Sequence, residues 1–428
     1  MDRRVVVLWK AVLASLVIAI LSAPIAWAAS GDLDPTFGDG GRVTTVFQNI
    51  LHDSRGEAVA LQPDGKIVVA GFSYSSCCRV FAIARYEPDG SPDPSFGGGD
   101  GKTRTQFVIN GQQRHAEANA VVIQPDGKIV VAGETDAGIG NGRFALARYD
   151  SDGTLDGSFG DGGTATTVFA GSAAGATGLA LVDEDKILVG GFAGDEFAYA
   201  RYEPDGDRDL TFRGDGRART AFATRSGAET LVGQSDGRFI LAGFVCRPEC
   251  LGGRFAVARY KSSGALDPSF SGDGKVITSF STGGLALDIA LQPDGRIVAG
   301  GAVGGRFALV RYTVAGALDD TFSGDGKLTS DFPDAGSANG VAIDEAGNIV
   351  VAGGHAGEGF ALARYTSAGQ LDVSFGAGGL VTTEFAGNSG GAADVLIQPD
   401  GAILAAGVGD TQTPDGLALA FALARYLP

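Results

Sequence analysis

The sequence is poor in the residues that most enzymes use for acid–base and metal chemistry. Its 428 residues include three histidines, one methionine and four cysteines, which excludes a histidine-rich metal centre. Basic residues are also few, since 33 Lys and Arg stand against 50 Asp and Glu, for a formal net charge of −17. Proteins hold nucleic acids and anionic membranes mainly through Lys and Arg. The composition therefore excludes nucleic acid as a partner.

Glycine, by contrast, is abundant, with 69 residues beside 15 prolines. The hydrophobic share of 44% is high enough for a buried core, so the chain is not intrinsically disordered. No Gly-X-Y period occurs, which excludes collagen. Abundant glycine in a chain that can fold indicates many turns, and many turns between short apolar segments are typical of an all-β protein.

Residues 1–28 have the pattern of a secretory signal peptide. A basic start with Arg3 and Arg4 precedes an apolar run at 11–23, and an Ala-x-Ala site ends at Ala28. The alternative is an uncleaved membrane anchor, but the run is short for the ~20 residues that span a bilayer. We therefore expect cleavage after Ala28, export to the periplasm or the cell exterior, and no membrane span in the mature chain.

The strongest signal is a unit that recurs seven times along the chain. Each copy has a Gly-x-Val-Thr-Thr-x-Phe type segment, an apolar segment, a tight turn of Pro-Asp-Gly type and a second apolar segment. A variable loop, a Phe-Ala-x-Ala-Arg-Tyr type segment and an Asp-Pro-Ser-Phe type segment follow. The first of these segments ends at Phe47, Phe107, Phe169, Phe222, Phe280, Phe332 and Phe385.

Four short strand signals per unit at this period predict a β-propeller blade. The fold class expected is therefore all-β, a seven-bladed β-propeller with four antiparallel strands per blade. A right-handed β-solenoid is the alternative, but its coils are shorter and do not need four strands. Residues 29–428 are then a single propeller domain.

A repeated arginine near the end of the third strand should be partly desolvated and needs an anion. An aspartate lies eight residues later in six copies: Arg85 and Asp93, Arg148 and Asp156, Arg201 and Asp209, Arg259 and Asp267, Arg311 and Asp319, and Arg364 and Asp372. The seventh arginine, Arg425, has no downstream partner, and the missing aspartate is Asp34. We therefore expect residues 31–47 to supply the outer strand of the last blade and to close the ring.

Specific motifs also connect the chain with known proteins: Leu-Asp-Pro-Thr-Phe-Gly at 33–38, Gln-Pro-Asp-Gly-Lys-Ile-Val-Val-Ala-Gly at 62–71 and 124–133, and Phe-Ala-Leu-Ala-Arg-Tyr at 144–149 and 360–365. With these motifs the sequence resembles the delta-60 repeat family of secreted bacterial proteins over residues 31–428. Two units depart from the turn pattern, at 182–185 and 344–347. The resemblance implies a propeller and brings no established activity.

Residues that are needed in every copy are expected to be scaffold, so function is expected where the copies differ. The copies differ in the loops after the second and fourth strands of each unit, which open on the same face of a propeller. We expect this rim to bind a protein or another envelope component. The protein would then be a monomeric, non-catalytic binding or scaffold module, with no assigned catalytic residues.

All four cysteines lie in two of these loops, as Cys77-Cys78 and as Cys246 with Cys250. In an exported chain an even cysteine count favours disulfides over thiolate metal ligands. We expect Cys246 and Cys250 to close their own loop, which leaves Cys77 and Cys78 as a vicinal disulfide or as free thiols. A four-cysteine zinc site would require two non-adjacent blades to meet.

A second candidate site is a ring of polar side chains at the mouth of the central channel. Its members lie five residues before the end of the inner strands or, for Asp288 and Asp394, one residue later. Carboxylate and amide oxygens are the ligands that Ca²⁺ prefers. Lactone hydrolases built on propellers use a similar centre of acids and amides, so the alternative function is a Ca²⁺-dependent hydrolase or a small-ligand binder. A hydrated polar channel without ligand is the simpler reading. The candidate metal ligands are Glu57, Asn119, Glu229, Asp288, Asn339 and Asp394.

Overall fold

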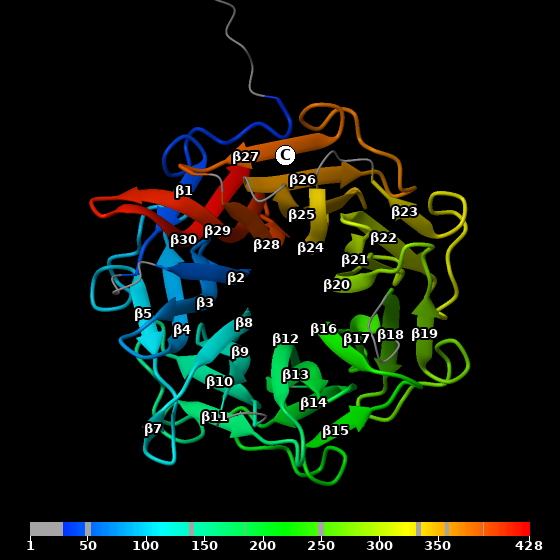
Figure 1. Ribbon diagram of the computed structural model, residues 1–428, viewed down its shortest axis with the longest axis horizontal. Helices are drawn as coiled ribbons and strands as arrows, with labels where there is room; N and C mark the ends of the chain where they lie inside the picture. Colours follow the sequence, from blue (N-terminus) through cyan, green and yellow to red (C-terminus); the bar gives the residue numbers. More distant parts are fainter. Residues whose placement is uncertain are drawn as a thin grey trace, which may run out of the picture.

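The computed structural model describes residues 29–47, 53–136, 141–183, 185–246, 252–330, 335–355, 359–387 and 389–428. The expected signal peptide, residues 1–28, lies outside these ranges. The regular elements of the described ranges are all β-strands, and seven four-stranded antiparallel sheets surround a central axis (Figure 1). None of these residues belongs to a helix long and apolar enough to cross a membrane. The predicted fold class is confirmed.

In blades 1 to 6, four consecutive strands run from the channel to the outer wall. Blades 1 to 3 consist of β2 (Ser54–Leu61), β3 (Ile67–Tyr74), β4 (Arg79–Tyr86) and β5 (Lys102–Thr105); β8 (Ala116–Ile123), β9 (Ile129–Thr135), β10 (Arg143–Tyr149) and β11 (Thr164–Thr167); and β12 (Ala174–Val182), β13 (Lys186–Ala193), β14 (Glu196–Tyr202) and β15 (Arg217–Thr220). Blades 4 to 6 consist of β16 (Ser226–Gly233), β17 (Phe239–Val245), β18 (Arg254–Tyr260) and β19 (Lys275–Thr278); β20 (Leu285–Leu291), β21 (Ile297–Val303), β22 (Arg306–Tyr312) and β23 (Lys327–Thr329); and β24 (Ala335–Ile343), β25 (Ile349–His355), β26 (Gly359–Tyr365) and β27 (Leu380–Glu384).

Blade 7 joins the two ends of the chain. It consists of β28 (Gly390–Ile397), β29 (Ile403–Thr413), β30 (Gly416–Tyr426) and β1 (Arg42–Thr45). A short extra hairpin, β6 (Val108–Ile109) and β7 (Gln112–Gln113), lies in the connection from blade 1 to blade 2.

The N-terminal segment closes the ring as the arginine–aspartate count predicts. Strand β1 pairs antiparallel with β30, from Arg42 opposite Ala424 to Thr45 opposite Phe421. Arg425 Nε donates to Asp34 Oδ2 at 2.8 Å. The Nη1 atom of the same arginine donates to the carbonyl oxygen of Pro88 in blade 1, also at 2.8 Å. One side chain therefore ties the first segment to the last blade and the last blade to the first.

The other six arginine–aspartate pairs also form. In blade 1, Arg85 Nε donates to Asp93 Oδ2 at 2.6 Å, and Nη1 donates to the carbonyl oxygen of Ser151 in blade 2 at 2.5 Å. The guanidinium lies 4.6 Å from the ring centroid of Phe96. The repeated arginines of blades 1 to 5 and of blade 7 each link their own blade to the next one in this way, whereas Arg364 bonds within blade 6.

A second cation, which was not predicted from the sequence, lies at five of these aspartates. Lys66, which directly follows the Pro-Asp-Gly turn, places Nζ 3.0 Å from Asp93 Oδ2. Burial alone would raise the pKa of Asp93, but hydrogen bonds from Ser95, Lys66 and Arg85 outweigh it and hold the pKa far below its usual value. The same turn position supplies Lys128, Lys186, Arg238 and Arg296 to the aspartates of blades 2 to 5.

The hydrophobic core lies between neighbouring blades and not within any one of them. The cluster around Phe81 and Ile83 of blade 1, for example, continues through Val131 and Ala145 of blade 2. The repeated tyrosines cross the same boundary: the Tyr86 hydroxyl of blade 1 donates to Thr45 of blade 7 at 2.7 Å. Equivalent pairs are Thr105 with Tyr149, Thr167 with Tyr202, Thr278 with Tyr312 and Thr383 with Tyr426.

Candidate functional site

The residues expected to form the channel ring share one backbone feature. In blade 1 the pairing of β2 with β3 skips from Gly56 to Ala58, so that Glu57 is the extra residue of a β-bulge. A bulge bends its strand and redirects the side chain of the extra residue. The skip recurs at the same position in every blade, and the extra residues are Glu57, Asn119, Thr177, Glu229, Leu287, Asn339 and Ala393.

These seven residues, with Asp288 and Asp394, line one cavity of about 220 Å³ on the channel axis. The structure thus brings all six candidate metal ligands together. The bulges occur near the start of each inner strand, where the chain arrives from the previous blade. The cavity therefore lies at the end of the channel that faces the variable loops, which we call the rim face.

Asp288 and Asp394 are engaged in contacts between blades. Asp394 of β28 accepts a hydrogen bond from Val59 N of blade 1 at 2.9 Å. Asp288 of β20 accepts from Val341 N of blade 6 at 2.7 Å and from Thr230 Oγ1 of blade 4 at 3.0 Å. Burial raises the pKa of Asp394 to about 6, and burial together with the charge of Asp394 raises the pKa of Asp288 to about 7. Both carboxyls therefore join their own blade to neighbouring blades through hydrogen bonds.

The polar hydrogen atoms of the ring also point toward neighbouring blades. Asn119 Nδ2 donates to Ala176 O, and Asn339 Nδ2 donates to Ala392 O, both at 2.8 Å. The hydroxyl of Thr177 donates in the same manner to the next blade. The amide oxygen of Asn339 accepts a hydrogen bond from Ser337 Oγ at 2.5 Å, whereas no described residue donates to the amide oxygen of Asn119. The described lining therefore offers hydrogen-bond acceptors and few donors.

Glu57 and Glu229 differ from the other ring residues because neither makes a hydrogen bond or an ion pair with a described residue. Burial in the narrow channel raises the pKa of each to about 7; Arg55 counteracts this for Glu57, and Glu117 reinforces it. Near neutral pH each group is therefore a mixture of acid and carboxylate. These two side chains are the cavity groups that are free to bind a cation or to exchange a proton.

A metal site at the axis would depend on amide oxygens as well as carboxylates. Within the described ranges, no three or more His, Cys, Asp or Glu side chains are grouped so that they would hold a metal ion. Glu57 and Glu229 come from blades that are not neighbours. The Ca²⁺ ligand set inferred from the sequence remains a prediction.

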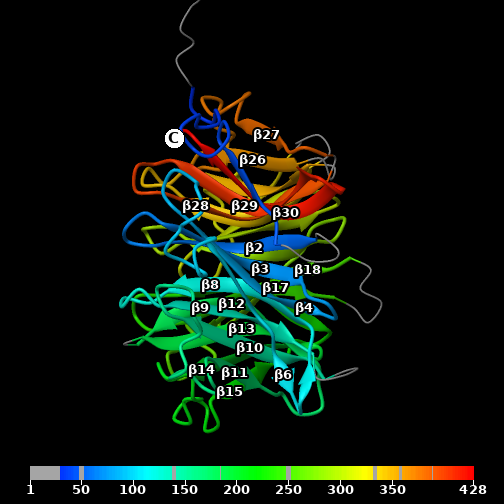
Figure 2. The same ribbon diagram turned by 90° about the vertical axis from the view of Figure 1, so that its left-hand side faces the viewer.

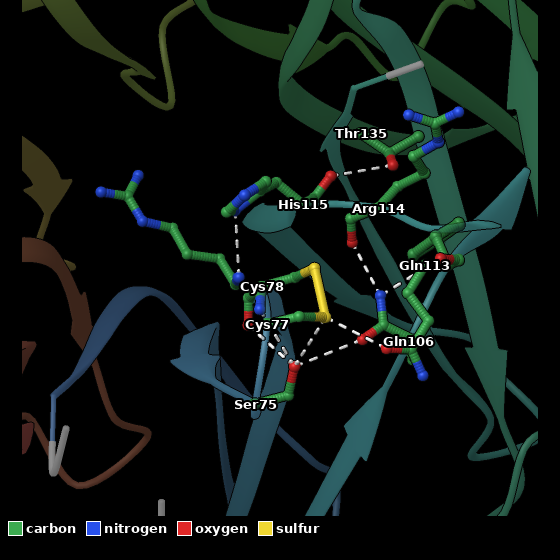
Figure 3. Close-up of a disulfide and its surroundings, with 10 residues drawn as sticks. Ser75, Cys77, Cys78, Gln106, Gln113, Arg114, His115 and Thr135 are labelled. Carbon is green, nitrogen blue, oxygen red and sulfur yellow. Dashed lines mark hydrogen bonds between the residues drawn. A yellow bond between two sulfur atoms is a disulfide. The ribbon is translucent and has the colours of Figure 1, made fainter. Parts of the chain in front are cut away.

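The rim carries a vicinal disulfide between Cys77 and Cys78, in the loop from β3 to β4 (Figure 3). Of the two readings left open by the sequence, the structure has the disulfide and not the free thiols. Cys78 is 6% exposed, while Cys77 is open to solvent. Ser75 Oγ donates to Cys78 O at 3.0 Å, and Cys77 Sγ lies 3.0 Å from Gln113 Oε1. The disulfide loop therefore touches the β6–β7 hairpin.

The second cysteine pair is only partly described. Cys246 is disulfide-bonded, and Cys250 lies outside the described residues. The pairing of Cys246 with Cys250 therefore remains a prediction.

Among the described residues, three structures on the rim each occur in one blade and not in the others. They are the disulfide loop of blade 1, the β6–β7 hairpin before blade 2 and the extension of β29 and β30 in blade 7 (Figure 1). β29 and β30 have 11 residues each, whereas the second and third strands of the other blades have seven or eight. Blades 7, 1 and 2 are consecutive around the ring. We call this part of the rim the insert sector, residues 75–78, 106–115 and 409–419.

Comparison with known proteins agrees with the fold. Residues 62–96, 124–159, 252–270, 292–322 and 347–375 match the model of a family described as a β-propeller domain of unknown function, DUF5122. No curated protein sequence matches the chain.

Solved structures resemble the chain at low sequence identity. Virginiamycin B lyase from Staphylococcus aureus, solved with quinupristin, is 12% identical at a TM-score of 0.51, over 90% of this chain and 99% of that one. An α-L-arabinofuranosidase from Fusarium graminearum is 10% identical at a TM-score of 0.46, over 93% and 98% of the two chains. An ulvan lyase is 11% identical at a TM-score of 0.45, over 89% and 95%. At these identities the likeness concerns the fold alone. The chain is thus a seven-bladed β-propeller made of a repeated unit and similar to a propeller family of unknown function, while the delta-60 resemblance remains a prediction.

Proposed function

We propose that the protein is an exported, non-catalytic binding or scaffold module that holds a protein or another envelope component on its rim face. The supporting observation is the insert sector: within the described residues, three structures that single blades possess lie on three consecutive blades of one face. The repeated polar residues, by contrast, are engaged in contacts that join the blades, as the Arg85 and Tyr86 hydrogen bonds illustrate. Loops that vary on a rigid scaffold are the usual location of binding surfaces.

The experiment compares capture of partners by three forms of the mature chain. One form is unaltered, one has residues 108–113 replaced by two glycines, and one carries Val373→Ser. Val373 is 76% exposed in a loop on the opposite face, so this variant is a matched surface control. Proteins cross-linked from the envelope and culture fluid are quantified by mass spectrometry, after equal thermal midpoints show that all forms are folded. We expect a set of proteins retained by the unaltered chain and the control and lost by the hairpin variant; capture that is equal in all three would refute the proposal.

A second candidate function is a small-ligand or Ca²⁺-dependent hydrolytic site at the channel axis. The specific observation is the cavity lining, in which Glu57 and Glu229 have no partner among the described residues and Asn119 donates its amide hydrogens to the next blade. A lining rich in free acceptors suits a hard cation or a ligand rich in donors.

This candidate is tested with Ca²⁺ alone. At pH 8, above the raised pKa values of Glu57 and Glu229, excess Ca²⁺ is expected to raise the thermal midpoint relative to chelator. The E57Q/E229Q variant is expected to lose this response. An unchanged midpoint in the unaltered chain counts against a cation site. Partner capture that is unaffected by the double variant would support the rim module instead.

A further inference from the structure

A groove of about 570 Å³ lies along β11, the outer strand of blade 2. Val108, Ile109 and Asn110 of the β6–β7 hairpin form one wall, and Thr166 belongs to the strand that forms the floor. In Figure 2, β6 lies beside β11. Val108 is 59% exposed. A groove of about 540 Å³ also lies along β5 of blade 1, but its lining includes Lys102 and Arg104 and no hairpin wall.

Strand β11 differs from the other outer strands in charge. An exposed outer strand presents unpaired backbone groups, and charged side chains, lysine above all, normally protect such an edge from other chains. β11 reads Thr-Ala-Thr-Thr and has no charged residue. The other six outer strands carry Arg42, Lys102, Arg217, Lys275, Lys327 and Glu384 among their residues. β11 is therefore the outer strand that lacks this protection.

The backbone of β11 offers hydrogen-bonding groups to the groove. Arg148 N donates to Gly163 O at 3.0 Å, which marks this opposed pair as hydrogen-bonded. Hydrogen-bonded and non-hydrogen-bonded pairs alternate along an antiparallel ladder, so the pair of Ala145 and Thr166 is of the second kind. The N–H and C=O of Thr166 therefore point away from β10 and toward the groove.

Charges of opposite sign lie at the two ends of the groove. Arg143 begins β10 beside the end of β11; it makes no hydrogen bond or ion pair with the described residues, and its buried Nε lacks an acceptor. A buried donor without an acceptor is costly, and a carboxylate is the natural partner of a guanidinium. Asp161, just before the start of β11, lines the other end together with Asp207 and Arg208 of blade 3. The groove thus complements an extended chain with an acidic residue at one end and a basic residue at the other.

We propose that an extended segment of a partner protein adds to β11 as a fifth strand of blade 2, with an Asp or Glu against Arg143 and a Lys or Arg against Asp161 and Asp207. Main-chain hydrogen bonds supply affinity in strand addition, and flanking side chains supply specificity. This inference rests on the proposed function and gives the binding module a docking mode. The hairpin wall and the bare edge strand of blade 2 confine the segment to this place.

The test uses defined peptides and the full mature chain. Two fluorescein-labelled, capped peptides, Glu-Thr-Val-Thr-Val-Thr-Lys and the same residues in reverse order, cover both strand directions. Binding is measured by fluorescence anisotropy, beside a peptide with Gln at both ends. We expect one of the charged peptides to bind saturably and the neutral peptide to bind about tenfold or more weakly, because charge-assisted hydrogen bonds are lost. Absence of binding by both charged peptides overturns the proposal.

Variants with matched controls locate the binding. Thr166→Pro removes the outward N–H and leaves the ladder to β10 intact, since proline is tolerated where the N–H of an edge strand faces outward. Ile277→Pro makes the same change at the equivalent position of β19, and Arg254→Ala is the control for Arg143→Ala. We expect T166P and R143A to weaken binding of the charged peptide by about tenfold or more. We expect the control variants I277P and R254A to bind it as tightly as the unaltered chain does. Binding that is indifferent to T166P and R143A overturns the docking mode.

Failure of this docking mode is distinguishable from failure of the proposed function. If the hairpin replacement abolishes partner capture while T166P and R143A capture normally, the rim module stands and strand addition at β11 is wrong. If capture does not depend on the hairpin at all, the rim module itself is wrong.

Discussion

Closure of the ring by the N-terminal segment leads to a quantitative prediction about Phe37. Its side chain is 0% exposed and packs under Arg425, whose guanidinium carbon lies 5.1 Å from the ring centroid. Phe96 has the same place one blade further on: it is also 0% exposed, with Arg85 at 4.6 Å. The two phenylalanines differ in that Phe96 lies within the continuous chain of blade 1, while Phe37 reaches its site only if the first segment joins the last blade.

Phe37→Ala and Phe96→Ala are therefore expected to lower the free energy of unfolding by the same amount. Replacing a buried phenylalanine by alanine removes its transfer free energy and leaves a cavity, which together amount to about 3–5 kcal/mol. Natural domains have free energies of unfolding of about 5–15 kcal/mol, so each substitution should remove a large part of the stability. Deletion of residues 29–47, which removes Phe37 together with Phe47 (3% exposed) and Asp34, should abolish the cooperative fold.

The assay is equilibrium unfolding in guanidinium chloride, followed by far-UV circular dichroism on the mature chain and on both variants. Equal shifts of the midpoint, with unchanged slopes, support a ring in which the first segment is as integral as any blade. A midpoint for Phe37→Ala close to that of the unaltered chain, beside a large shift for Phe96→Ala, would show that the first segment is merely appended. That result would refute the argument from the unpaired arginine.

Three further predictions concern the buried charges and the disulfide. Since the folded-state pKa of Glu57 and Glu229 is about 7 against an ordinary value of 4.5, the folded chain binds more protons than the unfolded chain between these pH values. The free energy of unfolding should therefore fall as the pH rises from about 4.5 to about 7. Urea titrations of the E57Q/E229Q variant should show a weaker decline over the same range. Arg259 is 2% exposed, and Arg259→Ala removes one of the two cations that contact the buried Asp267. Because Arg238 remains beside that carboxylate, chemical denaturation should show a loss of about 1.5–3 kcal/mol. Alkylation of the unreduced, denatured protein, read by peptide mass spectrometry, should leave Cys77 and Cys78 unlabelled; label on both residues would show that this disulfide is absent in solution.

The architecture could be predicted because the sequence contains seven copies of the same unit. A single aspartate at position 34 would mean little alone, but seven arginines and six downstream aspartates identify it as the partner of Arg425, and the structure forms that pair. The repeats also contain a basic residue after the turn whose role was not predicted from the sequence. A Lys or Arg follows the turn in five copies, and in each it reaches the aspartate of its own blade, as Lys66 reaches Asp93.

Features that depend on how neighbouring blades meet could not be predicted in the same way. Counting along each inner strand identified Asp288 and Asp394 as channel residues, but their hydrogen bonds to Val341 and Val59 depend on the offset between blades. The apolar wall of the groove beside β11 depends on where the hairpin lies against the next blade. The missing charge of β11, by contrast, is visible in the sequence once the seven outer strands are aligned.

The channel axis contains polar residues that the propeller scaffold does not require. Leu287 and Ala393 occupy the bulge position in blades 5 and 7, so the fold does not require a polar side chain there. Glu57 and Glu229 stand at the same position without a partner among the described residues, and their burial opposes ionisation. A half-buried carboxyl without a hydrogen-bond partner lowers stability and contributes no contact to the scaffold. A cation or a proton donor outside the chain would offset this cost, and the axial cavity, rather than the seven repeated ion pairs, is therefore the place to test for a small ligand.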